Sequence, residues 1–124
     1  MQTALHTVSY AGVWPGQARL DLAAAIRRAG QLGFDGVMIM AKRPHLSVLD
    51  APPAALAELR GVLEETGVAV PCLAGYTNFT ADAAHPDIPL GEMQIAYVTE
   101  LARLAQALGS VTPLPSREGD RGVG

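Results

Sequence analysis

A strand-like segment followed by a helical pattern occurs three times in this chain of 124 residues. The strand-like segments begin near residues 3, 36 and 68, a repeat of roughly 32 residues, which is the length of a strand–helix unit. The middle segment, Gly36–Met40, reads GVMIM, and such a continuous apolar run is typical of a parallel strand covered on both faces. The repeat therefore predicts an α/β fold with parallel strands.

Capping residues indicate where the first two helices begin and end. Asp21 is expected to cap the first helix, and Asp50 the second, whose first turn contains two prolines. Gly33 and Gly67 follow the two apolar stripes and are expected to end these helices. The strands are predicted over residues 3–8, 36–40 and 68–73.

The third helix is predicted over residues 90–108, with Gly109 after it. His85 and Asp87 are expected to contribute to its N-terminal cap. Its apolar residues should pack as one stripe, with Ile95, Val98, Ala102 and Ala105 along one side and Leu101, Leu104 and Leu108 beside them.

The expected fourth strand is missing. Residues 110–124 read SVTPLPSREGDRGVG, and two prolines in three positions remove donors that a central parallel strand needs. We therefore divide the chain into residues 1–109, with three strand–helix units, and a disordered or aberrant tail over residues 110–124. A frameshift or misplaced gene end is the favoured origin of the tail. The alternative is a natural short protein whose missing strands come from another chain.

Composition excludes several classes of function. The net charge is −3 and the charges are scattered, so no basic patch suits nucleic acid. No apolar run approaches about 18 residues, so we expect no membrane span. The single cysteine, Cys72, excludes an intrachain disulfide and lies in an apolar strand, where we expect an inert core thiol. With no secretory signal, these features predict a cytoplasmic protein.

Candidate substrate-binding residues follow the carboxyl ends of the predicted strands, where parallel α/β folds bind ligands. They are His6, Trp14, Lys42, Arg43, His45 and Tyr76. Together they suit a small polyhydroxylated or phosphorylated molecule.

Each candidate also has a structural interpretation. His6 is expected to bind a sugar hydroxyl, or to be a satisfied core histidine. Lys42 and Arg43 suit an anionic group, or are solvated loop charges. His45 suits a divalent metal, although no two further ligands lie near it in the sequence. Trp14 and Tyr76 would pack on a sugar ring or cover the mouth of a barrel.

No catalytic residue or metal ligand is assigned. The chain has no Gly-x-Gly-x-x-Gly, no Walker loop and no Cys-x-x-Cys. No pair of carboxylates follows neighbouring strands, because Asp82 lies in a long loop and Asp35 precedes its strand. An acid/base pair for proton transfer therefore cannot be assembled from these residues.

Three segments carry a resemblance to a known family: LHTVSYAG, LGFDGVMIMAKRPH and CLAGYTNFT, in this order and one unit apart. Over residues 1–109 the chain resembles the N-terminal part of the sugar phosphate isomerase/epimerase family. This family belongs to the xylose-isomerase-like TIM-barrel superfamily, which also contains endonuclease-IV-type repair enzymes.

The resemblance implies part of an eight-stranded (β/α) barrel of about 250 residues. Family members commonly hold one divalent metal (Mn, Mg, Co or Zn) through Glu, Asp, His and Glu from later strands. The metal stabilises an enediolate-like intermediate of a sugar or sugar phosphate while carboxylates move the proton. Those strands are not in this sequence, so we expect no metal for this chain. Many relatives also have a glutamate where this chain has Met38.

The resemblance predicts a truncated isomerase/epimerase that is inactive alone. A first alternative is a short α/β binding or assembly module that completes its sheet by self-association through an exposed strand edge. A second is a flavodoxin-like domain cut short, which the long Trp14 loop and the missing phosphate-binding turn disfavour.

Overall fold

The structure, a computed structural model of the chain, describes residues 1–109 as a mixed α/β fold. Its strands are β1 (Ala4–His6), β2 (Gly36–Met40) and β3 (Ala69–Ala74), and its helices are α1 (Leu22–Gln31), α2 (Pro53–Thr66) and α3 (Leu90–Leu108). Two 3₁₀ turns are η1 (Thr7–Tyr10) and η2 (Ala81–Ala83).

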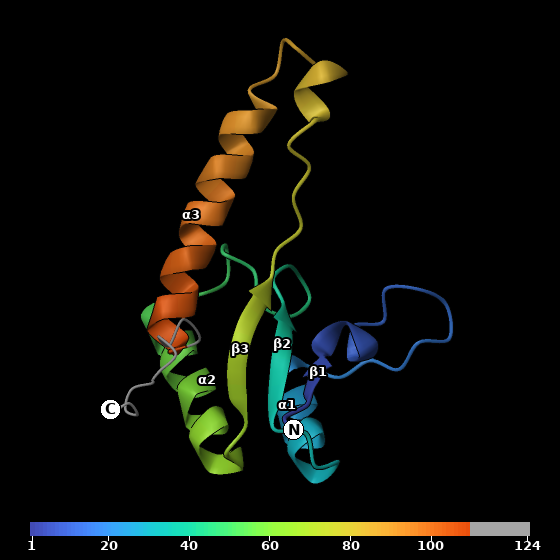
Figure 1. Cartoon of the computed structure of the whole chain (residues 1–124), viewed down its shortest axis with the longest axis vertical. Helices are drawn as coiled ribbons and strands as arrows, with labels where there is room; N and C mark the ends of the chain where they lie inside the picture. The colour runs from blue at the N-terminus through green and yellow to red at the C-terminus, as the bar shows by residue number, and fades with distance from the viewer. Residues whose placement is uncertain (110–124) are drawn as a thin grey trace.

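The strands form one parallel sheet in the order β1-β2-β3 (Figure 1). This confirms the predicted α/β fold with parallel strands. The tail predicted over residues 110–124 lies outside the described residues.

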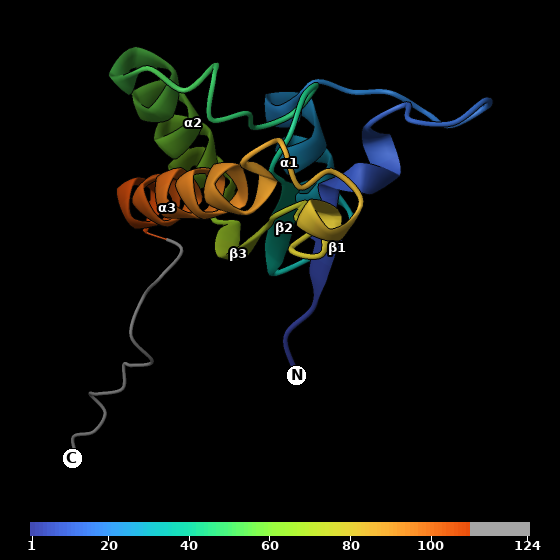
Figure 2. The same cartoon turned by 90° about the horizontal axis from the view of Figure 1, so that it is seen from above.

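The helices cover one face of the sheet. Figure 2 shows α1 and α2 together on one side of the strands. Val37 and Ile39 of β2 point into this layer and are 0% exposed, and they share one core with Ile26 of α1, Leu59 of α2 and Leu101 of α3. Within residues 1–109 none of α1, α2 and α3 covers the opposite face, although Met40 at the end of β2, beside η1, is 0% exposed.

The opposite face carries the alternate residues of each strand. His6, Met38 and Cys72 are register partners across the three strands, so they lie in one row. Met38 is half-buried and Cys72 is exposed. The interpretation of Cys72 as a core thiol is therefore wrong, because its side chain lies on the face that no helix of the described chain covers.

A register shift between β2 and β3 determines which face Cys72 occupies. Gly36 pairs with Ala69 and Met38 with Cys72, so β3 has one extra residue over this stretch. Pro71 lies in this bulge, where its missing N–H costs no regular ladder bond. Val70 and Leu73 therefore both pack against the helical core, although they are three residues apart.

The first strand is shorter than predicted. Strand β1 ends at His6, and Thr7–Tyr10 form the turn η1. The Nδ1 atom of His6 accepts a hydrogen bond from the Val8 N–H at 3.1 Å. This local side chain–backbone bond competes with the strand ladder and explains the early end of β1.

The glycine signals at the helix ends are confirmed, and one of the two aspartate caps is wrong. Asp21 accepts from the Ala24 N–H at 2.8 Å and caps α1. Gly67 and Gly109 end α2 and α3 in the left-handed region. Asp50 does not cap α2, whose N-cap is Pro52; its carboxylate is instead paired with Arg43.

Helix α3 is packed along only part of its length. Leu101, Leu104, Ala105 and Leu108 are buried, as predicted, whereas Ile95 is 62% exposed and Val98 is 42% exposed. The N-terminal part of α3 extends beyond the sheet (Figure 1), so its apolar residues have no layer to pack against. The single apolar stripe predicted for this helix is therefore wrong at Ile95, Val98 and Ala102, all of which are exposed.

The N-terminus of α3 is bonded by Asp82, which the sequence analysis assigned to a long loop and not to the cap. Asp82 accepts a hydrogen bond from the Gly91 N–H at 2.8 Å, whereas His85 and Asp87 make no capping bond within residues 1–109. The predicted cap is therefore wrong in its residues. Among the described helices, none is both long and apolar enough to cross a membrane.

Candidate functional site

The carboxyl ends of the three strands lie at one edge of the sheet, because the strands are parallel. Strand β1 ends there with His6, β2 with Met40 and β3 with Ala74. A backbone hydrogen bond from the Ala41 N–H to the Ala74 carbonyl, 3.0 Å long, extends the β2–β3 ladder one step further. Side chains that follow these ends are therefore brought close together in space.

Lys42 and Tyr76 meet at this edge. The Lys42 Nζ atom lies 5.1 Å from the centroid of the Tyr76 ring, which is the geometry of a cation–π contact. Burial, and then the neighbouring Tyr97, raises the pKa of the Tyr76 phenol, so the phenol is neutral at pH 7. Lys42 is exposed and forms no ion pair with any residue of the described chain. Its charge is therefore available to an anion.

Arg43 differs from its neighbour Lys42, because its charge is neutralised within the protein. Its Nε and Nη2 atoms lie 2.7 and 2.8 Å from the two carboxylate oxygens of Asp50. This bidentate pair raises the pKa of Arg43 and lowers the pKa of Asp50, chiefly through the hydrogen bonds between them. Arg43 therefore holds the loop after β2 and is not free to bind a ligand.

His6 offers a hydrogen-bond donor at the same edge. Because its Nδ1 accepts from the Val8 N–H, the proton of the neutral ring is on Nε2. Burial, and then the nearby His45, lowers the pKa of His6, which favours this neutral form. No residue within 1–109 accepts a hydrogen bond from Nε2. The ring therefore presents an N–H donor, which suits a sugar oxygen better than a metal.

His45 has no free ring nitrogen. It is 8% exposed, its Nε2 lies 3.0 Å from the Leu20 carbonyl, and its Nδ1 lies 2.9 Å from Thr7 Oγ1. A carbonyl only accepts, so Nε2 carries the proton and the Thr7 hydroxyl donates to Nδ1. Thr7 Oγ1 in turn accepts from the Met40 N–H at 2.9 Å. His45 thus links the loop after β2 to η1 and to the segment before α1.

Trp14 is not brought to the Lys42–Tyr76 pair. It is 57% exposed and lies in the loop between η1 and α1, which is closed by an antiparallel bridge between Ala11 and Arg19. No contact recorded within residues 1–109 joins it to Lys42, Tyr76 or His6. Of the six predicted residues, the structure brings Lys42 and Tyr76 into contact. His6 lies at the carboxyl end of β1, in the row of Met38 and Cys72, and no contact within residues 1–109 joins it to this pair.

Two residues of this region were not found from the sequence. Thr7 belongs to the buried network of His45. Tyr97 of α3 donates a hydrogen bond from its hydroxyl to the Ala41 carbonyl at 2.5 Å, and the hydroxyl accepts from the Tyr76 N–H at 3.3 Å. Tyr97 precedes Leu101 by four residues, so it continues the buried row of α3 with a polar tip. That spacing was the available signal.

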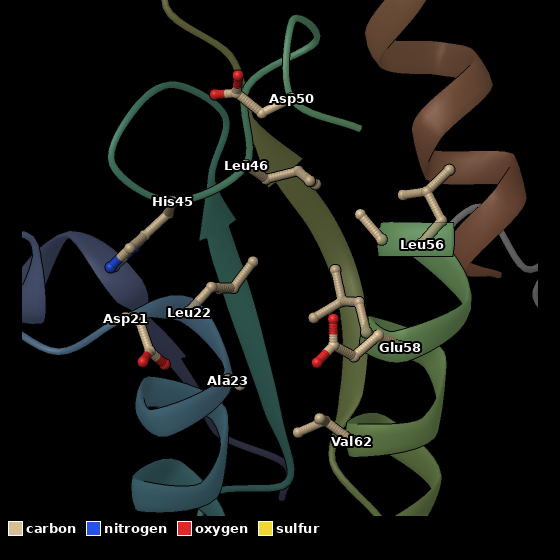
Figure 3. A pocket seen from close by; sticks show the side chains of 11 residues that line it. Asp21, Leu22, Ala23, His45, Leu46, Asp50, Leu56, Glu58 and Val62 are labelled. Atoms are coloured by element: carbon tan, nitrogen blue, oxygen red, sulfur yellow. The ribbon is translucent and has the colours of Figure 1, made fainter. Parts of the chain in front are cut away.

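A hollow of about 300 Å³ lies between α1 and α2 (Figure 3). Its wall is mainly apolar, with Leu22 from α1 and Leu56, Leu59 and Val62 from α2. Of the six predicted residues only His45 lines it, and both ring nitrogens of His45 are already engaged. The hollow is on the helical side of the sheet, so the candidate site and this hollow do not coincide.

The residues present do not fit the metal that the family resemblance implies. Within residues 1–109, no three His, Cys, Asp or Glu side chains come together in a group that would hold an ion. His6 and His45 each use a ring nitrogen that a ligand role would require.

Comparison with known proteins adds no family. A scan against protein-family models gives no match. A search of curated proteins also gives no match.

Proposed function

We propose that the carboxyl edge of this sheet binds the phosphate group of a sugar phosphate through Lys42, with Tyr76 beside it and His6 at the end of β1. The observation that carries this proposal is the state of the Lys42 ammonium group. It rests on the Tyr76 ring and is not neutralised by a carboxylate of the described chain, whereas the adjacent Arg43 is. A sugar above these groups would find a neutral N–H donor in His6.

The proposed lineage is that of a sugar phosphate isomerase/epimerase located in the cytoplasm, and the described residues are expected to be inactive alone. The sequence segments named above support it, and so does a parallel sheet whose helices lie on one face, as in one arc of a barrel. Isomerisation needs an acid/base pair or a metal to move the proton next to the carbonyl. Residues 1–109 gather neither at the edge, so binding without turnover is the expected behaviour.

Binding is tested by isothermal titration of ribose 5-phosphate and of ribose into the wild-type chain and two variants. Lys42→Met removes the charge and keeps the length of the side chain. We expect its Kd for ribose 5-phosphate to rise about tenfold to a hundredfold, since a charged hydrogen bond contributes about 1.5–3 kcal/mol. Arg43→Gln is the control, because Arg43 already pairs with Asp50.

Equal affinities of wild type and Lys42→Met for ribose 5-phosphate would overturn the binding site. Equal affinities for ribose and ribose 5-phosphate would overturn the phosphate. Conversion of the sugar phosphate by the purified chain, with or without added manganese, would overturn the proposed lack of turnover.

A second function, as an assembly module, is favoured by a separate observation. In residues 1–109 the outer edges of β1 and β3 have no partner strand, and Ile95 and Val98 of α3 are exposed on the helix that follows β3. A second copy of the chain would cover both. Sedimentation equilibrium tests this function: a stable oligomer supports it, and a monomer at every concentration excludes it.

A further inference from the structure

The hydroxyl of Tyr97 joins the two backbone segments that carry the Lys42–Tyr76 pair. Its donor bond goes to the carbonyl of Ala41, the residue directly before Lys42, at 2.5 Å. Its acceptor bond comes from the N–H of Tyr76 itself, at 3.3 Å. The same Tyr97 oxygen therefore holds the backbone directly before Lys42 and the backbone of Tyr76 itself.

This link begins where the sheet ends. The last backbone hydrogen bond that joins β2 to β3 in the described chain runs from the Ala41 N–H to the Ala74 carbonyl. Beyond this bond the segments that follow β2 and β3 lead into different loops. Lys42 lies on the first of these segments and Tyr76 on the second. Tyr97 provides the next connection, and it comes from α3, 56 positions along the chain from Ala41.

The Tyr97 ring is held firmly enough to position other groups. It is half-buried and packs against the hydrophobic core next to Leu101 of the same helix. A tyrosine has only two rotatable side-chain bonds, so a packed ring leaves its hydroxyl at nearly one place. The hydroxyl thus ties the carboxyl edge of the sheet to α3, because it bonds backbone atoms that follow β2 and β3.

We infer that Tyr97 is a positioning residue: it fixes the distance between the Lys42 ammonium and the Tyr76 ring without touching a ligand. Its consequence for phosphate binding rests on the function proposed above. Without the hydroxyl, the ammonium would sample more positions before binding and would have to be ordered when the anion arrives.

The position of the Lys42 side chain can be measured without any ligand. Lys42 is the single lysine of the chain, so lysine labelled with ¹³C gives one set of side-chain signals. In the wild type, the Tyr76 ring current should shift the ε-methylene protons of Lys42 upfield. In Tyr97→Phe, which removes one oxygen and keeps the ring, most of this shift should be lost. Tyr76→Leu gives the value without a ring.

Tyr10→Phe is the matched control. It also removes one phenol oxygen, and the Tyr10 hydroxyl makes no hydrogen bond that is recorded within residues 1–109. Its Lys42 signals should remain at the wild-type position. In parallel, the Kd of Tyr97→Phe for ribose 5-phosphate should rise about twofold to tenfold, the range expected for ordering one long side chain.

An unchanged Lys42 shift in a folded Tyr97→Phe protein would overturn the inference. A lost shift in a protein that does not bind ribose 5-phosphate even as wild type would support the positioning role and reject the proposed function instead. If Tyr97→Phe does not fold, amide exchange in the wild type decides: a Tyr76 N–H held by Tyr97 exchanges more slowly than that of Thr77, and equal rates contradict the link.

Discussion

The two faces of the sheet are built from the same three strands but meet different surroundings. On the helical face, Val37 and Ile39 are 0% exposed and share a core with all three helices. On the opposite face, Met38 is half-buried and its register partner Cys72 is exposed, whereas Met40 at the end of β2, beside η1, is 0% exposed. The difference shows that an apolar strand is buried only where another element of the fold covers it.

The largest expected change in the free energy of unfolding distinguishes two neighbouring residues of β2, Ile39 and Met38. Ile39→Ala removes a fully buried side chain and should lower the free energy of unfolding by about 2–5 kcal/mol. Met38→Ala acts on the other face, where contact is incomplete, and should cost about 1 kcal/mol or less. Urea denaturation followed by circular dichroism measures both. Equal losses would show that both faces are covered in solution, for example by a second copy.

Gly36 tests how closely the strands approach each other at the bulge. A Cβ atom there would lie 2.9 Å from the Ala69 carbonyl oxygen, a backbone atom that cannot turn away. Gly36→Ala should therefore lower the free energy of unfolding by about 1–3 kcal/mol.

Gly61→Ala is the control for this substitution. Gly61 lies inside α2, and a methyl group added there would have no heavy atom of a neighbouring element within 4 Å, so alanine should raise stability by up to about 1 kcal/mol. The same sign for both glycine variants in thermal or urea unfolding would contradict the register of β2 against β3.

Cys72 reports directly on whether its face is open. The thiol is exposed, so a thiol reagent such as DTNB should modify it fully in the native protein, at a rate independent of unfolding. Cys72→Ser should change the free energy of unfolding by no more than about 0.5 kcal/mol. Modification that occurs only as fast as the protein unfolds would mean that this face is covered.

The smallest effect concerns the titration of His6. Burial lowers its pKa below the ordinary value of 6.5, so the folded protein takes up a proton on His6 less readily than the unfolded chain. The stabilisation is complete above the unfolded pKa and is lost as the pH falls through the folded pKa. The ring protons of His6, followed by NMR, should titrate at lower pH in the folded chain than in urea. A midpoint at or above the urea value would contradict the burial.

Local signals predicted the fold well. Asp21 and the glycines at positions 33, 67 and 109 lie at helix ends because capping depends on neighbouring backbone atoms alone. The run Gly36–Met40 was predicted with its observed limits. Strand β1 was predicted too long, because the bond from the Val8 N–H to the His6 ring competes with the ladder.

The candidate site was predicted only in part. The rule that ligand-binding residues follow parallel strands selected Lys42 and Tyr76, which the structure brings into contact, whereas His6 lies at the end of β1 with no contact to either. It could not separate Lys42 from Arg43, because the difference is an ion pair with Asp50, seven positions away in a loop. It also missed Tyr97, whose hydroxyl reaches Ala41 across the fold.

The order of strands and helices, the parallel sheet and most helix ends could be read from the amino-acid sequence, because these features depend on residues a few positions apart. Three features required the folded chain: His45 is enclosed in a network with Thr7, Cys72 lies on the uncovered face, and Ile95 is exposed. Whether a residue is buried, and which groups it bonds, depends on the part of the fold that packs next to it. In this chain, that part of the fold comes from residues far away in the sequence.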